Sequence, residues 1–165
     1  MQKVKPLKKT YFCKKKILMI QRIQTLYLLI SAILIAFLIV LPFAEILSDG
    51  AIYQFNIKGV LLDGVLKKNG ALISILTGIT LATHGYAILN YKNRTRQIRV
   101  IVFAILFLLG VIGTFYFFTY FSFSGSKISF KMGAVFPLVA IILDYLAIRA
   151  IGKDEALIRS IDRIR

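Results

Sequence analysis

Four long apolar stretches constrain this chain more than any other feature of its sequence. Each is about 20 residues long, and they cover residues 24–44, 70–90, 99–121 and 132–151. A helix rises about 1.5 Å per residue, so each stretch matches the roughly 30 Å hydrocarbon layer of a bilayer. A helix also satisfies its own backbone polar groups where no water is available. The sequence therefore predicts an all-α membrane protein, with residues 19–165 forming a single four-transmembrane-helix bundle.

The composition argues against a water-soluble domain. The chain is 58% hydrophobic and 18% charged, whereas a soluble globular domain carries about 25% charged residues. Too little polar sequence remains to coat four apolar helices. We therefore expect the lipid bilayer itself to be the main surrounding of this protein.

The distribution of basic residues predicts the orientation in the membrane. With four spans, the N-terminal segment, the second loop and the C-terminal segment share one side, and they hold 17 of the 22 Lys and Arg residues. The positive-inside rule places that side in the cytoplasm, so we expect a multi-pass membrane protein with both termini cytoplasmic. The net charge of +15 would then attract the protein to anionic lipid headgroups. Nucleic acid is not an expected partner, because the charge is split over three short segments without a binding module.

The first 18 residues form a basic extension that differs in character from the rest of the chain. Met19 begins the sequence MIQRIQT, which leads directly into the first apolar stretch. Translation from Met1 and translation from Met19 are both compatible with this pattern. The predicted orientation holds in either case.

Three polar segments resemble one protein family. They are Met19–Thr25, the loop sequence YKNRTRQIR at 91–99, and the ending RAIGKDEALIRSIDRIR at 149–165. In these segments the chain resembles the DUF4293 family of uncharacterised integral membrane proteins of the Bacteroidetes. The resemblance implies a four-span inner-membrane protein of bacterial origin, and it implies no activity.

All three segments lie on the predicted cytoplasmic side, where their side chains are candidates for contact with lipid headgroups or a partner protein. Residues 153–165 are expected to form a cytoplasmic amphipathic helix that continues or turns from the fourth span. Arginine and amide groups suit phosphate and carboxylate ligands. The candidate contact residues are Asn93, Arg94, Arg96, Gln97, Arg99, Arg159, Arg163 and Arg165.

Two polar residues stand out inside the apolar stretches. His84 and Asp144 both lie about six residues from the cytoplasmic ends of their spans, so we expect them to share a depth and to form a hydrogen bond. An ionised carboxylate in mid-bilayer costs at least about 2.5 kcal/mol, which favours an interior position. The pair would either hold helices together or carry a proton or cation. Gly78, Ala82 and Gly85 form a stripe beside His84 that predicts close helix packing.

The outer loops predict some strand structure. Residues 52–58 alternate apolar and polar side chains after a Ser-Asp-Gly turn, and residues 121–130 resemble a hairpin around Ser-Gly-Ser. We expect a small extracytoplasmic β-hairpin cap on the outer end of the bundle. The aromatic run at 115–123 is typical of an interface belt.

Enzyme motifs are missing from the sequence. One His, one Cys and seven acidic residues do not assemble a metal site, a catalytic triad or a phosphate loop at plausible spacing. We therefore expect no enzyme, no cofactor and no metal. Two functions stay open. The first is a structural or accessory subunit that docks a partner through its basic cytoplasmic face, and the alternative is a small oligomeric transporter or channel component that uses His84 and Asp144.

Overall fold

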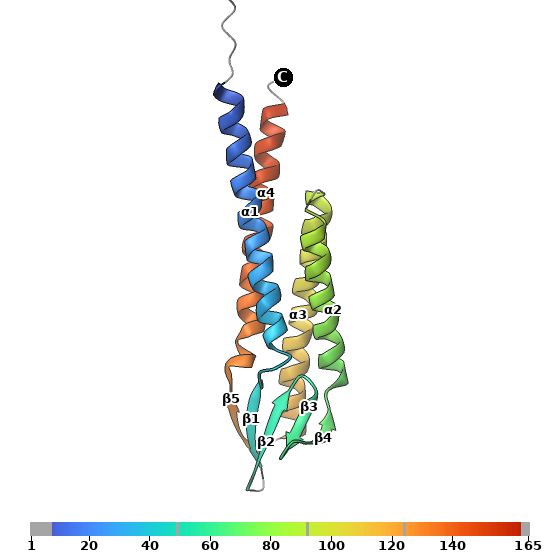
Figure 1. The fold of residues 1–165 in the computed structure, drawn as a ribbon. Coiled ribbons are helices and arrows are strands. Elements are labelled where there is room, and N and C mark those ends of the chain that lie inside the picture. The colour runs from blue at the N-terminus through green and yellow to red at the C-terminus, as the bar shows by residue number, and fades with distance from the viewer. Residues whose placement is uncertain (1–7, 49, 92, 124, 163–165) are drawn as a thin grey trace, which may run out of the picture.

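The computed structural model describes residues 8–162 apart from 49, 92 and 124, and it describes side chains over 23–156 apart from 49, 92, 122 and 124. The helices run side by side along the molecule, and the strands gather at one end (Figure 1). We call this the sheet end, and we call the opposite end, where α2 turns into α3, the turn end. The elements are α1 (Lys8–Phe37), β1 (Ala44–Ser48), β2 (Ala51–Asn56), β3 (Gly59–Leu62), β4 (Val65–Asn69), α2 (Ala71–Leu89), α3 (Arg94–Ser122), β5 (Lys127–Phe130), the 3-10 turn η1 (Met132–Ala134) and α4 (Phe136–Asp162).

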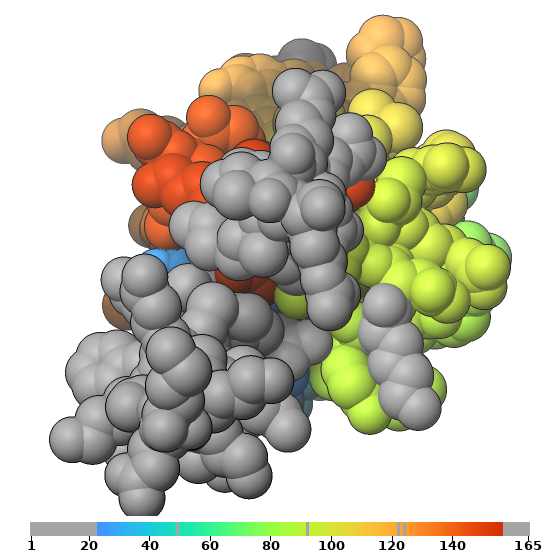
Figure 2. All heavy atoms as spheres, turned by 90° about the horizontal axis from the view of Figure 1, so that it is seen from above, coloured from blue at the N-terminus to red at the C-terminus, as the bar shows by residue number. Residues whose placement is uncertain are grey.

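The helices pack in two close pairs. α1 lies along α4 and α2 lies along α3, while contacts of α1 with α2 and of α3 with α4 join the pairs. At the turn end α1 and α4 extend well beyond the α2–α3 turn (Figure 1). Seen from that end, the α2–α3 region lies to one side of α4 (Figure 2). The buried faces recur every three or four residues, as in the series Ala140, Asp144, Ala147, Ile151 and Asp154 of α4.

The strands form one antiparallel sheet in the order β4-β3-β2-β1-β5. β1 to β4 follow α1, whereas β5 comes from the loop between α3 and α4 and pairs with β1. One face of the sheet packs on the helix ends, where the Phe115 ring lies 5.1 Å from the ring of Phe43 and 5.3 Å from that of Phe55. Part of the expected aromatic belt is thus core, while Phe117 and Phe121 are exposed.

The all-α fold class predicted from the sequence is wrong. The protein is mixed α and β, because the hairpin cap expected at the outer end is a five-stranded sheet drawn from both loops. The main error lies at the end of the first apolar stretch. α1 ends at Phe37, short of the expected residue 44, and the chain turns through Pro42 into β1. The Phe43 amide then donates to the Phe55 carbonyl (2.7 Å), and the Phe43 carbonyl accepts from Lys131 (2.9 Å). An apolar run alone does not distinguish a helix from a buried strand.

Two glycines allow the sheet to meet α2. Gly59 has a φ of +126°, which side chains rarely adopt, and a Cβ there would overlap the carbonyl oxygen of Lys68. A Cβ on Gly70 would lie 2.7 Å from the Gly59 backbone. The Gly70 amide donates to the Lys58 carbonyl at 2.8 Å. This close crossing fixes where α2 begins.

Three helices are long and apolar enough to cross a membrane. Over the residues that the structure describes, they are Ala71–Leu89, Arg94–Phe121 and Met132–Ala156, and Ile23–Phe37 of α1 is a shorter apolar helix. Many large apolar side chains on their outer faces are exposed, including Leu72, Phe103 and Ile142. These helices are compatible with a membrane protein.

The two ends of the chain continue the long helices. α1 includes residues 8–18 and passes through Met19 without a break, and residues 1–7 lie outside the described part. α4 is continuous to Asp162, so residues 153–162 extend the same helix that contains the fourth apolar stretch. Pro137 lies in the first turn of α4, where its missing amide hydrogen costs nothing.

Candidate functional site

His84, Asp144 and Ser31 meet in the middle of the bundle. The His84 Nε2 atom lies 3.0 and 3.1 Å from the two carboxylate oxygens of Asp144 and 3.1 Å from the Ser31 hydroxyl. All three residues are fully buried. Since they belong to α2, α4 and α1, this cluster joins three helices at one level. The hydrogen bond expected between His84 and Asp144 is present.

The surroundings of the imidazole determine where its hydrogens lie. The Nδ1 atom is 2.9 Å from the Thr80 carbonyl oxygen, which can only accept, so Nδ1 carries a hydrogen and donates it. The hydrogen bond between Nε2 and Asp144 then requires one further proton. That proton lies either on Nε2 or on the carboxyl group. The pair is neutral overall in both arrangements, which suits a position within an apolar bundle.

A second polar cluster lies nearer the turn end. An Asp154 carboxylate oxygen lies 3.2 Å from the Arg94 guanidinium, and it accepts a hydrogen bond from the Gln24 amide at 3.4 Å. These residues come from α4, α3 and α1. Asp144 and Asp154 are ten positions apart in the sequence, which corresponds to about 15 Å along α4. The two clusters therefore join the helices at two separate levels.

Gln97 completes the packing at the turn end. Its side chain is buried, and its amide donates to the Ala87 carbonyl at 3.0 Å. This carbonyl lies in the last turn of α2, where the helix itself supplies no donor. Gln97 therefore caps α2 from the first turn of α3.

The residues expected to contact lipid or a partner divide into two groups. Gln97 is buried and Arg94 largely so, each with a partner inside the protein, because the first turn of α3 packs on α2 and α4. Asn93, Arg96 and Arg99 are exposed. The other three candidates are not placed: no side chain is described for Arg159, and Arg163 and Arg165 lie outside the described residues.

Sequence reasoning missed three members of these clusters. Ser31 and Gln24 are polar residues of the first apolar stretch, seven residues apart and so on one helix face. That spacing could have identified them as interior groups. No local pattern indicates the contact of Asp154 with Arg94, because it depends on the tertiary structure.

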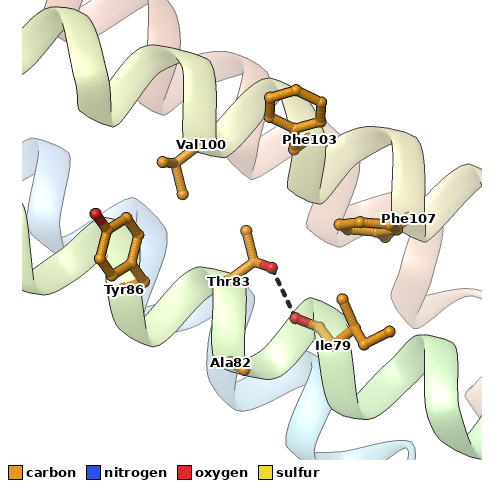
Figure 3. A pocket seen from close by; sticks show the side chains of 7 residues that line it. All are labelled: Ile79, Ala82, Thr83, Tyr86, Val100, Phe103 and Phe107. Carbon is orange, nitrogen blue, oxygen red and sulfur yellow. Dashed lines mark hydrogen bonds between the residues drawn. The ribbon is translucent and has the colours of Figure 1, made fainter.

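Two cavities lined by described residues lie away from both clusters. A cavity of about 440 Å³ lies between α2 and α3 and is lined by Ile79, Ala82, Thr83, Tyr86, Val100, Phe103 and Phe107 (Figure 3). Another, of about 330 Å³, lies on the sheet beside Glu45, Gln54 and Asp63. Over the described residues, no three His, Cys, Asp or Glu side chains are grouped so that they could hold a metal ion.

Apolar helix surfaces outside and neutralised polar groups inside are compatible with an integral membrane protein whose helices are held together by interior hydrogen bonds. The family model for a domain of unknown function, DUF4293, matches residues 20–164, so the chain belongs to the DUF4293 family. No curated protein and no solved structure matches the chain.

Proposed function

We propose that this protein is a non-catalytic subunit of a bacterial inner membrane that docks a partner protein through the turn end of α4. Both termini and the α2–α3 turn are on the cytoplasmic side in this proposal. The main support is the change from apolar to basic side chains along the exposed face of α4. Ile142 and Tyr145 are exposed apolar residues, and Arg149 and Lys153 follow them on the same face. A partner at the membrane surface would meet these two cations.

The arrangement of the helices supports this surface. α4 and α1 extend together beyond the α2–α3 turn (Figure 1), which offers a two-helix projection to a partner. At the base of this projection, level with the start of α3, Asp154 contacts Arg94 and Gln24. The basic residues Arg149 and Lys153 are exposed. Such a surface favours a partner with acidic groups.

The geometry favours docking over transport. His84 and Asp144 are fully buried, and their side-chain polar atoms face Thr80, Ser31 and each other. The two described cavities are lined by other residues. A proton or cation path needs access for water, so the pair is better suited to holding helices together.

The docking proposal is tested by comparing two charge reversals. One variant carries Arg149→Glu and Lys153→Glu, and the matched control carries Lys67→Glu and Lys127→Glu at the sheet end. The protein is purified in mild detergent, and co-purifying chains are quantified by mass spectrometry. We expect a partner in stoichiometric amount with the wild type and the control, and its loss with the first variant. Equal recovery from both variants would overturn the proposed surface.

The membrane orientation is tested separately. A lysine reagent that cannot cross the membrane is added to intact spheroplasts, in which the outer side is accessible. We expect labelling of Lys67 and Lys127, which are exposed near the sheet end, and protection of Lys153. The opposite pattern, or a protein that stays soluble without detergent, would overturn the location.

A further inference from the structure

A groove between α2 and α3 opens to the outside of the bundle. Its residues recur at helical spacing, so one face of each helix lines it (Figure 3). The cavity of about 440 Å³ falls within the usual range for small-molecule sites, about 300–1,000 Å³. Figure 3 places Thr83 at the centre, between Tyr86, Val100 and Phe107.

The lining of this groove is apolar in effect. The Thr83 hydroxyl donates to the Ile79 carbonyl at 2.7 Å, which leaves its methyl group for the groove. The groove faces the outside of the bundle, since Tyr86 is 50% exposed and Phe103 is 57% exposed. In a bilayer, this surface meets the acyl chains of lipids. Its apolar lining suits a hydrocarbon chain.

The turn end of the groove carries positive charge. Arg96 and Arg99 precede Val100 and Phe103 by four residues each, so Arg96 lies one turn beyond the apolar lining of α3 and Arg99 lies level with its end. Both are exposed. α2, the other wall, contains no acidic residue. The groove therefore has an apolar lining that leads, along one face of α3, to a positively charged end.

We propose that this groove binds an anionic phospholipid, with its phosphate at Arg96 and Arg99 and one acyl chain between α2 and α3. Charge complementarity selects the occupant, because the guanidinium forks of arginine match phosphate oxygens. An anionic headgroup joined to a hydrocarbon tail matches both parts of the surface. The inference rests on the membrane location proposed above and is independent of the docking of a partner.

A second copy of the chain is the main competing occupant. Gly78 and Gly85 on α2 have open space around them, and a neighbouring helix could approach there. Two copies inserted in the same direction and related by a two-fold axis would, however, bring Arg96 and Arg99 of each copy to the same depth on facing surfaces. That like-charge contact disfavours the dimer and favours a phosphate.

The test counts bound lipids by native mass spectrometry after the whole protein is purified in detergent. The probes are dioleoyl phosphatidylglycerol, which is anionic, and dioleoyl phosphatidylcholine, which has the same chains without net charge. Each arginine near the headgroups contributes about fivefold in affinity, so Arg96→Gln with Arg99→Gln should weaken phosphatidylglycerol binding about thirtyfold. The matched control, Lys67→Gln with Lys127→Gln, removes the same charge at the sheet end, away from the arginines of the groove, and should leave that affinity unchanged.

A second variant tests the groove itself. Thr83→Phe fills the centre of the groove while both arginines stay, so it should also reduce phosphatidylglycerol binding. Equal binding of the two lipids by the wild type would overturn the proposal without any variant. So would equal losses in the two double variants, or a dimer that Thr83→Phe dissociates. The docking proposal is tested by recovery of a partner protein after substitutions on α4, whereas the lipid proposal is tested by lipid binding after substitutions on α2 and α3. Failure of one is therefore distinguishable from failure of the other.

Discussion

Replacing His84 and Asp144 one at a time and together tests the interior cluster most directly. The expected costs follow from the hydrogen bonds that each change leaves unmade. His84→Leu leaves the buried Asp144 carboxyl without its imidazole partner, which should lower the free energy of unfolding by about 2 kcal/mol. Asp144→Leu should cost about 1 kcal/mol, because the His84 Nε2 atom keeps the Ser31 hydroxyl.

The double variant should be far more stable than the two single costs imply. With both groups replaced by leucine, no unpaired polar group remains, so stability should fall within about 1 kcal/mol of the wild type. The coupling between His84 and Asp144 is then about 2 kcal/mol, near the upper end for hydrogen bonds between membrane helices. Asp144→Asn serves as the control. Its amide can donate to Nε2, so it should cost about 0.5 kcal/mol or less.

The measurement is loss of helical circular dichroism during titration of the detergent-solubilised protein with sodium dodecyl sulfate. The chain contains no tryptophan, so circular dichroism is the more direct probe. Additive costs of the two leucine substitutions would refute the direct contact. If Asp144→Asn lowers stability as much as Asp144→Leu does, a neutral amide cannot replace the carboxyl group as hydrogen-bond partner of His84. That result would refute this part of the reasoning.

Three further changes test other parts of the fold by the same titration unless stated. Asp154→Leu leaves the largely buried Arg94 without its carboxylate and should cost about 1–2 kcal/mol, and adding Arg94→Leu should restore part of the loss; no restoration would contradict the pairing. Gln97→Leu should cost about 1 kcal/mol and speed amide exchange in the last turn of α2, whereas unchanged exchange would contradict the cap. Gly59→Ala should cost more than about 2 kcal/mol, and Gly64→Ala, which has positive φ and open space, about 1 kcal/mol; equal costs would contradict the close crossing.

The helical part of the fold was predictable because the apolar stretches are long. Residues 70–90 and 99–121 were expected as helices; α2 covers 71–89 of the first range and α3 covers the whole of the second. The strands were only partly predictable. Alternation at 52–58 indicated a strand, but β1 is a five-residue segment that begins where the first apolar stretch ends, too short for its local pattern to separate strand from helix. Its place in the sheet depends on pairing with β2 and also with β5, about 80 residues later in the chain.

The interior site was predictable to the extent that shared depth determines it. His84 and Asp144 were expected to meet because each lies equally far from the end of its helix, and this inference needs no tertiary structure. Ser31 and the Asp154 cluster depend on which helices are neighbours, and an isolated sequence does not specify that. The stripe of small residues illustrates the same point. Gly78 and Gly85 lie on the outer side of α2, away from the expected helix contacts.

The pairing of β1 with β5 has a consequence for biosynthesis. β1 to β4 emerge before α2, but their free edge at Ala44–Leu47 is covered only when residues 127–130 arrive, after α3 has been made. A chain that stops before Lys127 therefore leaves an open strand edge, which is a template for aggregation. Closure of the sheet therefore requires that α3 has been made and that the loop after it lies beside the strands that follow α1.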